Sequence, residues 1–270
     1  MATPSRLGDY LRARRDLVQP EDVGVAAGGG HRRVPGLRRE EVAILAGIST
    51  EYYLRLEQGR DLHPSDQVLT ALARVLRLDV FGAAYLHQLA HTVPAVPSVE
   101  GDAVDRSIQW LIDSWPTTAA VIHNRYVDVL ATNALARALS PTFRVGVNNV
   151  LSLLIDPADR AFHRGWEELT ARSVALLRSL SGQRTDDPRL RALVDELSAR
   201  SERFRALWNR NDVVLVSNGR HELFHPEVGD LTLHFARLPL LGTDNHSIFL
   251  YQAEPGSPSA AALASLAAHE

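Results

Sequence analysis

The stretch LRREEVAILAGISTEYYLRLEQGR, residues Leu37 to Arg60, decides the fold of the first third of this chain. Its apolar residues have helical spacing on both sides of a single glycine, Gly47. A glycine that ends a helix adopts the left-handed conformation at little cost, and Ser49 is suited to cap the helix that follows. The stretch therefore predicts two short helices joined by a tight turn, which is a helix-turn-helix unit.

The second helix of this unit carries side chains suited to reading DNA. In such a unit the second helix enters the major groove with its N-terminus first. We expect Thr50, Glu51, Tyr52 and Arg55 to point outward, and Tyr53 to lie in the core. Arginine pairs with guanine, glutamate accepts from cytosine, and threonine contacts a thymine methyl group. The pattern alone leaves one alternative open, an ordinary helical hairpin with a solvated face.

Length and composition bound the class of protein. The chain has 270 residues, 45% hydrophobic and 23% charged, which is typical of a globular protein and favours two domains. It has no cysteine, which excludes disulfides and thiolate metal sites. We find no apolar run of membrane-helix length and no secretory signal, so we expect a cytoplasmic protein. The net charge of -3 does not by itself indicate nucleic-acid binding.

The rest of the chain divides at HTVPAVPSVEGD, a proline-containing stretch without periodicity. We place a helical domain at residues 1–92, in which Ser65 and Asp79 begin helices, a linker at 93–103, and a second domain at 104–270. The second domain begins with one helical face, formed by Ile108, Leu111, Ile112 and Trp115, and two short strands follow around a turn near Asn124. It continues with long helices and ends in a β-rich region that starts with DVVLVS at 212–217. Ser201 is an alternative N-cap within the last long helix. The order indicates an α+β domain with a mostly antiparallel sheet and helices on one face.

The N-terminal third resembles a known family. REEVAILAGISTEYYLRLEQGR followed by HPSDQVLTALARVLRL is similar to the XRE (Cro/repressor-type) helix-turn-helix domain, over residues 6 to 90, and to the subfamily with the pattern PGLRREEVAxLAGxSxxYYxRLEQGR. The resemblance implies an all-α five-helix DNA-binding domain, whose recognition helix closes at Glu57 and Gly59. The candidate DNA-binding residues are Arg38, Arg39, Ser49, Thr50, Glu51, Tyr52, Arg55, Gln58 and Arg60.

The remainder resembles the MmyB-like regulators. The similar stretches are NRYVDVLATNALARAL, DPADRAFHRGWEE, DDPRLRALVDELSARSERFRALWNRNDV, HPEVGDLTL and YQAEPGSPS. The resemblance implies a PAS-like ligand-binding domain with an antiparallel sheet, and a fatty acid as the ligand reported for the family. We expect no other cofactor. The expected partners are a small apolar ligand and double-stranded DNA with a pseudo-palindromic operator, which a homodimer would read as two half-sites.

Candidate ligand-binding residues are large or charged groups near segment junctions. An arginine is the apt partner for a buried carboxylate, through paired charge-assisted hydrogen bonds. For each candidate, ordinary packing or a surface role is the alternative. The candidates are Trp110, Trp115, Arg125, Phe143, Phe162, His163, Trp166, Arg172, Trp208, Phe224 and Phe235. His225 is a further possible partner for a carboxylate head.

Other functions are weighed against this one. The second domain is alternatively a ligand-free dimerisation or protein-interaction module. An enzyme is not expected, because the sequence has no G-x-S-x-G, no P-loop and no G-x-G-x-x-G motif. His87 and His91 lie four residues apart on a predicted helix, a spacing that can bind metal. With no third ligand evident nearby, we expect no metal site there.

Overall fold

A computed structural model describes residues 6–25, 34, 36–61, 63–91, 101–181, 187–214 and 217–268. The chain divides into two compact units. We call Met1–Pro94 with Gly182–Asp186 and Ala206–Val214 the N-terminal unit, and Ala95–Ser181 with Asp187–Arg205 and Leu215–Glu270 the C-terminal unit. Most of the predicted linker lies outside the described residues. Among the described residues, no helix is long and apolar enough to cross a membrane.

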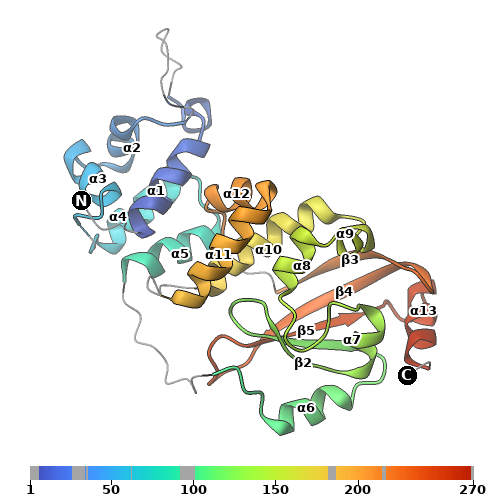
Figure 1. Ribbon diagram of the computed structural model, residues 1–270. Helices are drawn as coiled ribbons and strands as arrows, with labels where there is room; N and C mark the ends of the chain where they lie inside the picture. Colours follow the sequence, from blue (N-terminus) through green and yellow to red (C-terminus); the bar gives the residue numbers. More distant parts are fainter. Residues whose placement is uncertain are drawn as a thin grey trace. The chain divides into compact units, whose positions relative to one another are not determined.

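The N-terminal unit contains the five predicted α-helices (Figure 1). They are α1 Arg6–Leu17, α2 Arg39–Ala46, α3 Thr50–Glu57, α4 Asp66–Val75 and α5 Val80–Ala90, with a short 3-10 helix, η1 Pro20–Val23, after α1. The predicted turn is confirmed, because Gly47 ends α2 with a φ of 70° and the Ser49 hydroxyl accepts a hydrogen bond from the Tyr52 backbone N–H at 3.1 Å. The caps at Ser65 and Asp79 are confirmed as well.

The helices of the N-terminal unit share one apolar core. Tyr53 and Leu56 of α3 are fully buried with Val42 of α2 and Leu69 of α4. This confirms the core position predicted for Tyr53. Helix α1 crosses the end of α3 so closely that a Cβ on Gly8 would lie 2.3 Å from the Glu57 carbonyl oxygen. Only glycine fits at this crossing.

The C-terminal unit is built on a five-stranded sheet, β1 Ala119–His123, β2 Val129–Thr132, β3 Asn218–His225, β4 Gly229–Pro239 and β5 Ser247–Gln252. The strand order is β2-β1-β5-β4-β3, and every pair is antiparallel. The predicted α+β class with an antiparallel sheet is confirmed. Side chains alternate along β4, since Leu231, Leu233 and Phe235 are buried while His234 is exposed.

Helices pack on both faces of this sheet. The helices that follow α5 in the described chain are α6 Arg106–Asp113, α7 Ala134–Leu139, α8 Asn149–Ile155, α9 Pro157–Phe162, α10 Trp166–Ser181, α11 Pro188–Arg200, α12 Glu202–Asn209 and α13 Pro258–Ala267. Figure 1 shows α6 on the opposite side of the sheet from α8 and α10. The expectation of helices on one face is wrong, because β1 and β5 are apolar on both faces. Ile112 of α6 covers the second face, where it packs with Ile122 and Ile248.

Two further expectations have a definite outcome. Ser201 does divide the predicted long helix, since its hydroxyl accepts a hydrogen bond from the Phe204 backbone N–H at 3.1 Å and α12 begins at Glu202. The strand predicted at DVVLVS is wrong for its described residues, because 212–214 lie outside any strand. Val213 packs against the core of the N-terminal unit, and Asp212 pairs with Arg14 at 2.7 Å. Val213 therefore packs against helices rather than against the sheet.

Candidate functional site

A buried carboxylate organises the helix-turn-helix. Glu57, at the end of α3, is 3% exposed, and its two oxygens accept hydrogen bonds from different arginines. Arg15 Nε of α1 lies 2.7 Å from Oε1, and Arg39 Nε of α2 lies 2.6 Å from Oε2. Arg15 also donates to the Leu37 carbonyl oxygen at 2.8 Å. The carboxylate thus ties together the three helices that surround the turn.

The predicted DNA-binding residues lie around the start of α2 and along α3. Seven are exposed, namely Arg38, Arg39, Ser49, Thr50, Glu51, Arg55 and Arg60. Tyr52 and Gln58 are half-buried, and the Arg55 guanidinium lies 5.6 Å from the centre of the Tyr52 ring. Arg39, one of these candidates, also donates from its Nε to Glu57. Its side chain remains 44% exposed.

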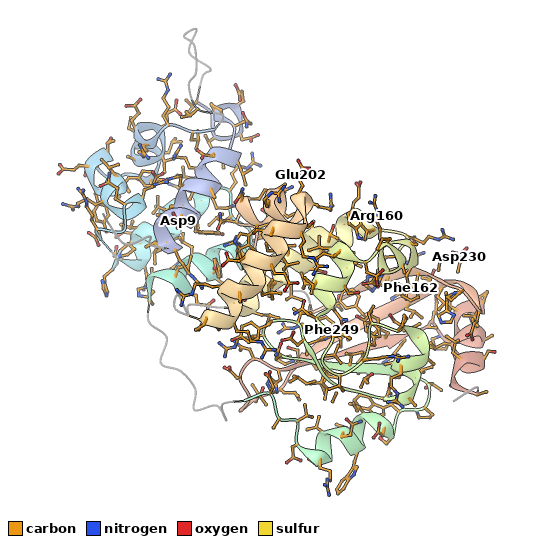
Figure 2. All side chains as sticks on the ribbon, in the orientation of Figure 1. Asp9, Arg160, Phe162, Glu202, Asp230 and Phe249 are labelled. Atoms are coloured by element: carbon orange, nitrogen blue, oxygen red, sulfur yellow. The ribbon has the colours of Figure 1, made fainter. Side chains whose placement is uncertain are left out.

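The C-terminal unit contains a mostly apolar cavity of about 100 Å³ between the sheet and helices α8 and α10. Figure 2 shows Phe249 inside this unit, in contrast to Asp230, which lies at its surface. Both helices contribute apolar side chains to the lining, among them Val150 and Leu153 of α8 and Leu169 and Leu176 of α10. On the opposite wall, β4 and β5 contribute Phe235, Phe249 and Tyr251.

Polar side chains gather at one end of the cavity. The rings of His163 and His221 stack with centroids 5.4 Å apart, and His221 also stacks on Tyr251 at 6.0 Å. Arg172 of α10 lies over Phe235, 5.8 Å from its centroid. Three of these residues, His163, Arg172 and His221, also line a neighbouring polar pocket of about 380 Å³. They therefore stand at the boundary between an apolar space and a polar one.

Several ring nitrogens at the cavity have no hydrogen-bond partner among the described residues. These are both nitrogens of His221 and Nδ1 of His163 and of His123. His163 Nε2 lies 3.4 Å from Asp159 Oδ1, and His123 Nε2 lies 2.6 Å from Asn149 Oδ1. Burial lowers the pKa of His221 to about 3 and that of His123 to about 4. Both imidazoles are therefore neutral at pH 7, able to donate one hydrogen bond and accept another.

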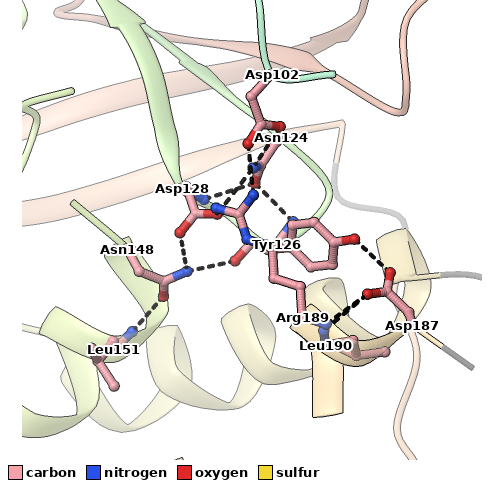
Figure 3. A network of polar contacts seen from close by, with 9 residues as sticks. All are labelled: Asp102, Asn124, Tyr126, Asp128, Asn148, Leu151, Asp187, Arg189 and Leu190. Carbon is pink, nitrogen blue, oxygen red and sulfur yellow. Dashed lines mark hydrogen bonds and ion pairs between the residues drawn. The ribbon is translucent and has the colours of Figure 1, made fainter. Parts of the chain in front are cut away.

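A polar network holds the cavity wall formed by the β1–β2 turn and α8 (Figure 3). Arg189 of α11 forms an ion pair with Asp128 beside this turn. Asn148, the N-cap of α8, donates to Asp128 at 2.9 Å and to the Tyr126 carbonyl oxygen at 2.8 Å. The network therefore fixes the positions of Val127 and of α8, both of which line the cavity.

Four of the predicted ligand residues line the cavity, and seven do not. Those that line it are Phe143, His163, Arg172 and Phe235. The side chains of the other seven lie elsewhere in the fold. Sequence reasoning missed His123, His221, Phe249 and Tyr251. The signal for these four is their alternation along β1, β3 and β5. It places them on the face covered by α8 and α10, together with Phe235.

Three of the misplaced candidates lie at surfaces or in other parts of the fold. Trp110 is 65% exposed on α6. Trp115 packs with Ile112 on the opposite face of the sheet. Trp208 belongs to the segment Ala206–Val214 of the N-terminal unit.

The other four misplaced candidates are held by specific contacts. Arg125 is buried in an ion pair with Asp244. Trp166 donates from Nε1 to the Leu153 carbonyl oxygen at 2.7 Å. Phe162 packs against His163 and His225, while Phe224 is 42% exposed beneath Arg164. His225, the further candidate, has its Nε2 3.1 Å from the Ala138 carbonyl oxygen.

Comparison with known protein families assigns both units. The model of the MmyB-like transcription regulator ligand binding domain matches residues 104–266, and a model of a helix-turn-helix domain matches residues 6–83. The chain belongs to the MmyB-like transcription regulators. It combines a helix-turn-helix DNA-binding domain with a ligand-binding domain, and both domains point away from catalysis. No curated protein matches the sequence closely.

Glu57→Gln tests the ion pairs that Glu57 forms with Arg15 and Arg39 in this MmyB-like regulator. The substitution removes the charge that accepts the hydrogen bond from Nε of Arg15, whose side chain is 6% exposed. We expect the N-terminal unit to lose about 3–5 kcal/mol of unfolding free energy. Arg39→Ala should cost less, because that arginine is 44% exposed. Urea unfolding followed by circular dichroism measures both, and equal losses would contradict the account.

The buried histidines predict a dependence of stability on pH. In the unfolded chain His221 takes up a proton as pH falls below about 6.5, whereas burial keeps it neutral in the folded state. The unfolding free energy of the MmyB-like domain therefore decreases as the pH decreases. His221 contributes up to about 1.4 kcal/mol per pH unit to this decrease. In His221→Asn the slope between pH 6 and 4.5 should shrink by that amount in urea unfolding. The exposed His234, changed to Asn, serves as the control.

Proposed function

We propose that this regulator binds a fatty acid in the cavity of its C-terminal unit, with the carboxylate at Arg172. One observation carries the proposal. Arg172 lines the cavity, yet it makes no hydrogen bond or ion pair with any described residue. Its guanidinium lies over the Phe235 ring in a cation–π contact. A guanidinium in such a position is suited to a carboxylate, which it binds through two parallel hydrogen bonds.

The surroundings of Arg172 favour a ligand with one polar and one apolar end. The inner cavity is lined by aliphatic and aromatic side chains, and the outer pocket by Glu168, Arg220 and Glu222. Arg172, His163 and His221 lie between the two, and among the described residues both nitrogens of His221 and Nδ1 of His163 have no hydrogen-bond partner. A fatty-acid head would meet three donors there, while its chain would displace water from apolar surface.

The small volume of the inner cavity supports an alternative to ligand binding. About 100 Å³ is less than the roughly 150 Å³ of an engineered cavity that takes up benzene. The C-terminal unit would then be a packed module for dimerisation or protein contact, and a long acyl chain would require the PAS-like core to open between sheet and helices. Extraction of the purified protein with mass spectrometry separates the two, since recovery of a stoichiometric lipid supports the pocket. No lipid, and no thermal shift with fatty acids of eight to eighteen carbons, supports the packed module.

The regulator would act as a homodimer on a pseudo-palindromic operator, because a single helix-turn-helix reads one half-site. A ligand changes DNA affinity only if it binds one arrangement of the dimer better than another. We propose that the acyl ligand does so by selecting the spacing of the two recognition helices.

Arg172→Gln tests the position of the head group. Loss of a charge-assisted hydrogen bond costs about 1.5–3 kcal/mol, so fatty-acid affinity should fall about 10- to 150-fold by calorimetry. Arg164→Gln is the matched control, since that arginine pairs with Asp230 at the surface. If both variants bind a fatty acid as the unchanged protein does, the carboxylate does not lie at Arg172.

Arg55→Ala tests the DNA-reading face of α3. We expect a loss of about 1–3 kcal/mol in binding at one base position, and relaxed sequence preference there. Arg38→Ala should instead weaken binding to all sequences evenly and flatten the salt dependence, because a phosphate contact carries no sequence information. Binding to selected operator variants, measured by fluorescence anisotropy, distinguishes them. Unchanged sequence preference in Arg55→Ala would mean that another side chain reads the base.

A further inference from the structure

Two histidines and an aspartate converge on one point of the N-terminal unit. His87 and His91 lie one turn apart on α5, and Asp66 is the first residue of α4. His87 Nδ1 lies 3.2 Å and His91 Nε2 lies 3.0 Å from the same carboxylate oxygen, Asp66 Oδ1. The three ligand atoms lie within 4.8 Å of one another. The third ligand that the sequence did not reveal is thus supplied by the fold.

Asp66 is not needed to cap its own helix. The N-cap of α4 is Ser65, whose hydroxyl accepts a hydrogen bond from the Val68 backbone N–H at 3.4 Å. Asp66 instead directs its side chain toward α5, where one carboxylate oxygen lies close to both imidazoles.

The arrangement matches the coordination chemistry of a borderline divalent cation. Two imidazole nitrogens and one carboxylate oxygen suit Zn²⁺, whereas Ca²⁺ and Mg²⁺ prefer sets of oxygen ligands. Ligand atoms about 2.0–2.2 Å from tetrahedral Zn²⁺ lie about 3.3 Å from one another. The two distances to Asp66 Oδ1, 3.0 and 3.2 Å, are close to this value. Only the two ring nitrogens must approach each other, and both rings are partly exposed, at 33% and 47%.

Simple hydrogen bonding from the two rings is the competing explanation. It accounts for each distance separately, but it does not require both imidazoles to address one oxygen of a carboxylate that is 78% exposed. Convergence of three ligand atoms around a common point is what a metal ion requires.

We propose that Asp66, His87 and His91 form a Zn²⁺ site that links the start of α4 to the end of α5. Three protein ligands leave the fourth position open to water, and exposure of the side chains lets the ion exchange with solvent. Because Asp66 joins α5 to the helix that packs against α2, bound zinc stabilises the whole DNA-binding unit. The ion contacts none of the residues predicted to bind DNA.

The test is zinc binding to the full chain, freed of any histidine tag and stripped with a chelator. Titration with ZnCl₂ against a chromophoric zinc indicator should give one tight site per chain, and zinc should raise the midpoint of thermal unfolding. His87→Gln and His91→Gln should each abolish the stoichiometric site and the thermal shift. Asp66→Asn, which keeps the shape of the side chain, should weaken zinc binding at least tenfold.

Controls separate this site from adventitious binding by other histidines, since the chain has 11 histidines including His87 and His91. His234→Gln changes an exposed histidine of the C-terminal unit and should leave the zinc stoichiometry and the thermal shift unchanged. We expect each variant to fold, since all three ligand side chains are at least partly exposed. Circular dichroism checks that each variant is folded. The proposal is overturned if the unchanged chain takes up no stoichiometric zinc, or if the His87→Gln, His91→Gln double variant takes up as much as the unchanged chain does.

Discussion

The DNA-binding unit depends on one buried carboxylate, that of Glu57. Burial of a charge is costly unless it is paired and hydrogen-bonded, and here both oxygens are engaged by arginines from two other helices. Because Arg15 comes from α1 and Arg39 from α2, the charge is satisfied only when the three helices meet in one arrangement. That arrangement turns the opposite side of α3, with Thr50 and Arg55, toward solvent.

A different constraint shapes the C-terminal unit, where the central strands are apolar on both faces. Helix α6 covers one face closely, whereas α8 and α10 leave an apolar cavity over the other. His163, His221 and Arg172 lie where that cavity meets the neighbouring polar pocket, and there His221 is kept neutral by burial and Arg172 lacks an ion-pair partner among the described residues. An amphipathic ligand, for which we propose a fatty acid, would satisfy both the apolar lining and these polar groups.

Local signals in the sequence were sufficient for much of the fold. Glycine at a left-handed position and hydroxyl or carboxylate side chains at helix starts act over a few residues, so Gly47, Ser49 and Ser65 were assigned correctly. The ion pair between Arg15 and Glu57 joins positions 42 residues apart, and no local pattern marks it.

Sites assembled from distant segments were harder to predict for the same reason. Large aromatic residues near segment junctions suggested a pocket, but size does not say which way a side chain points, and Trp110 proved to be exposed. His221 lines the cavity because β3 pairs with β4 in one register, and Asp66 meets His91 because α4 packs on α5. Pairing and packing of this kind are set by the whole fold.

The most direct test of the account is whether the acyl ligand and DNA influence each other's binding. The operator is first selected from random DNA with the purified regulator, and its affinity is then measured by fluorescence anisotropy with and without a saturating fatty acid. A ligand-controlled regulator predicts a change of about 5- to 150-fold, and an equal change in fatty-acid affinity when DNA is present. Identical operator affinity with the cavity filled and with it empty would contradict the account.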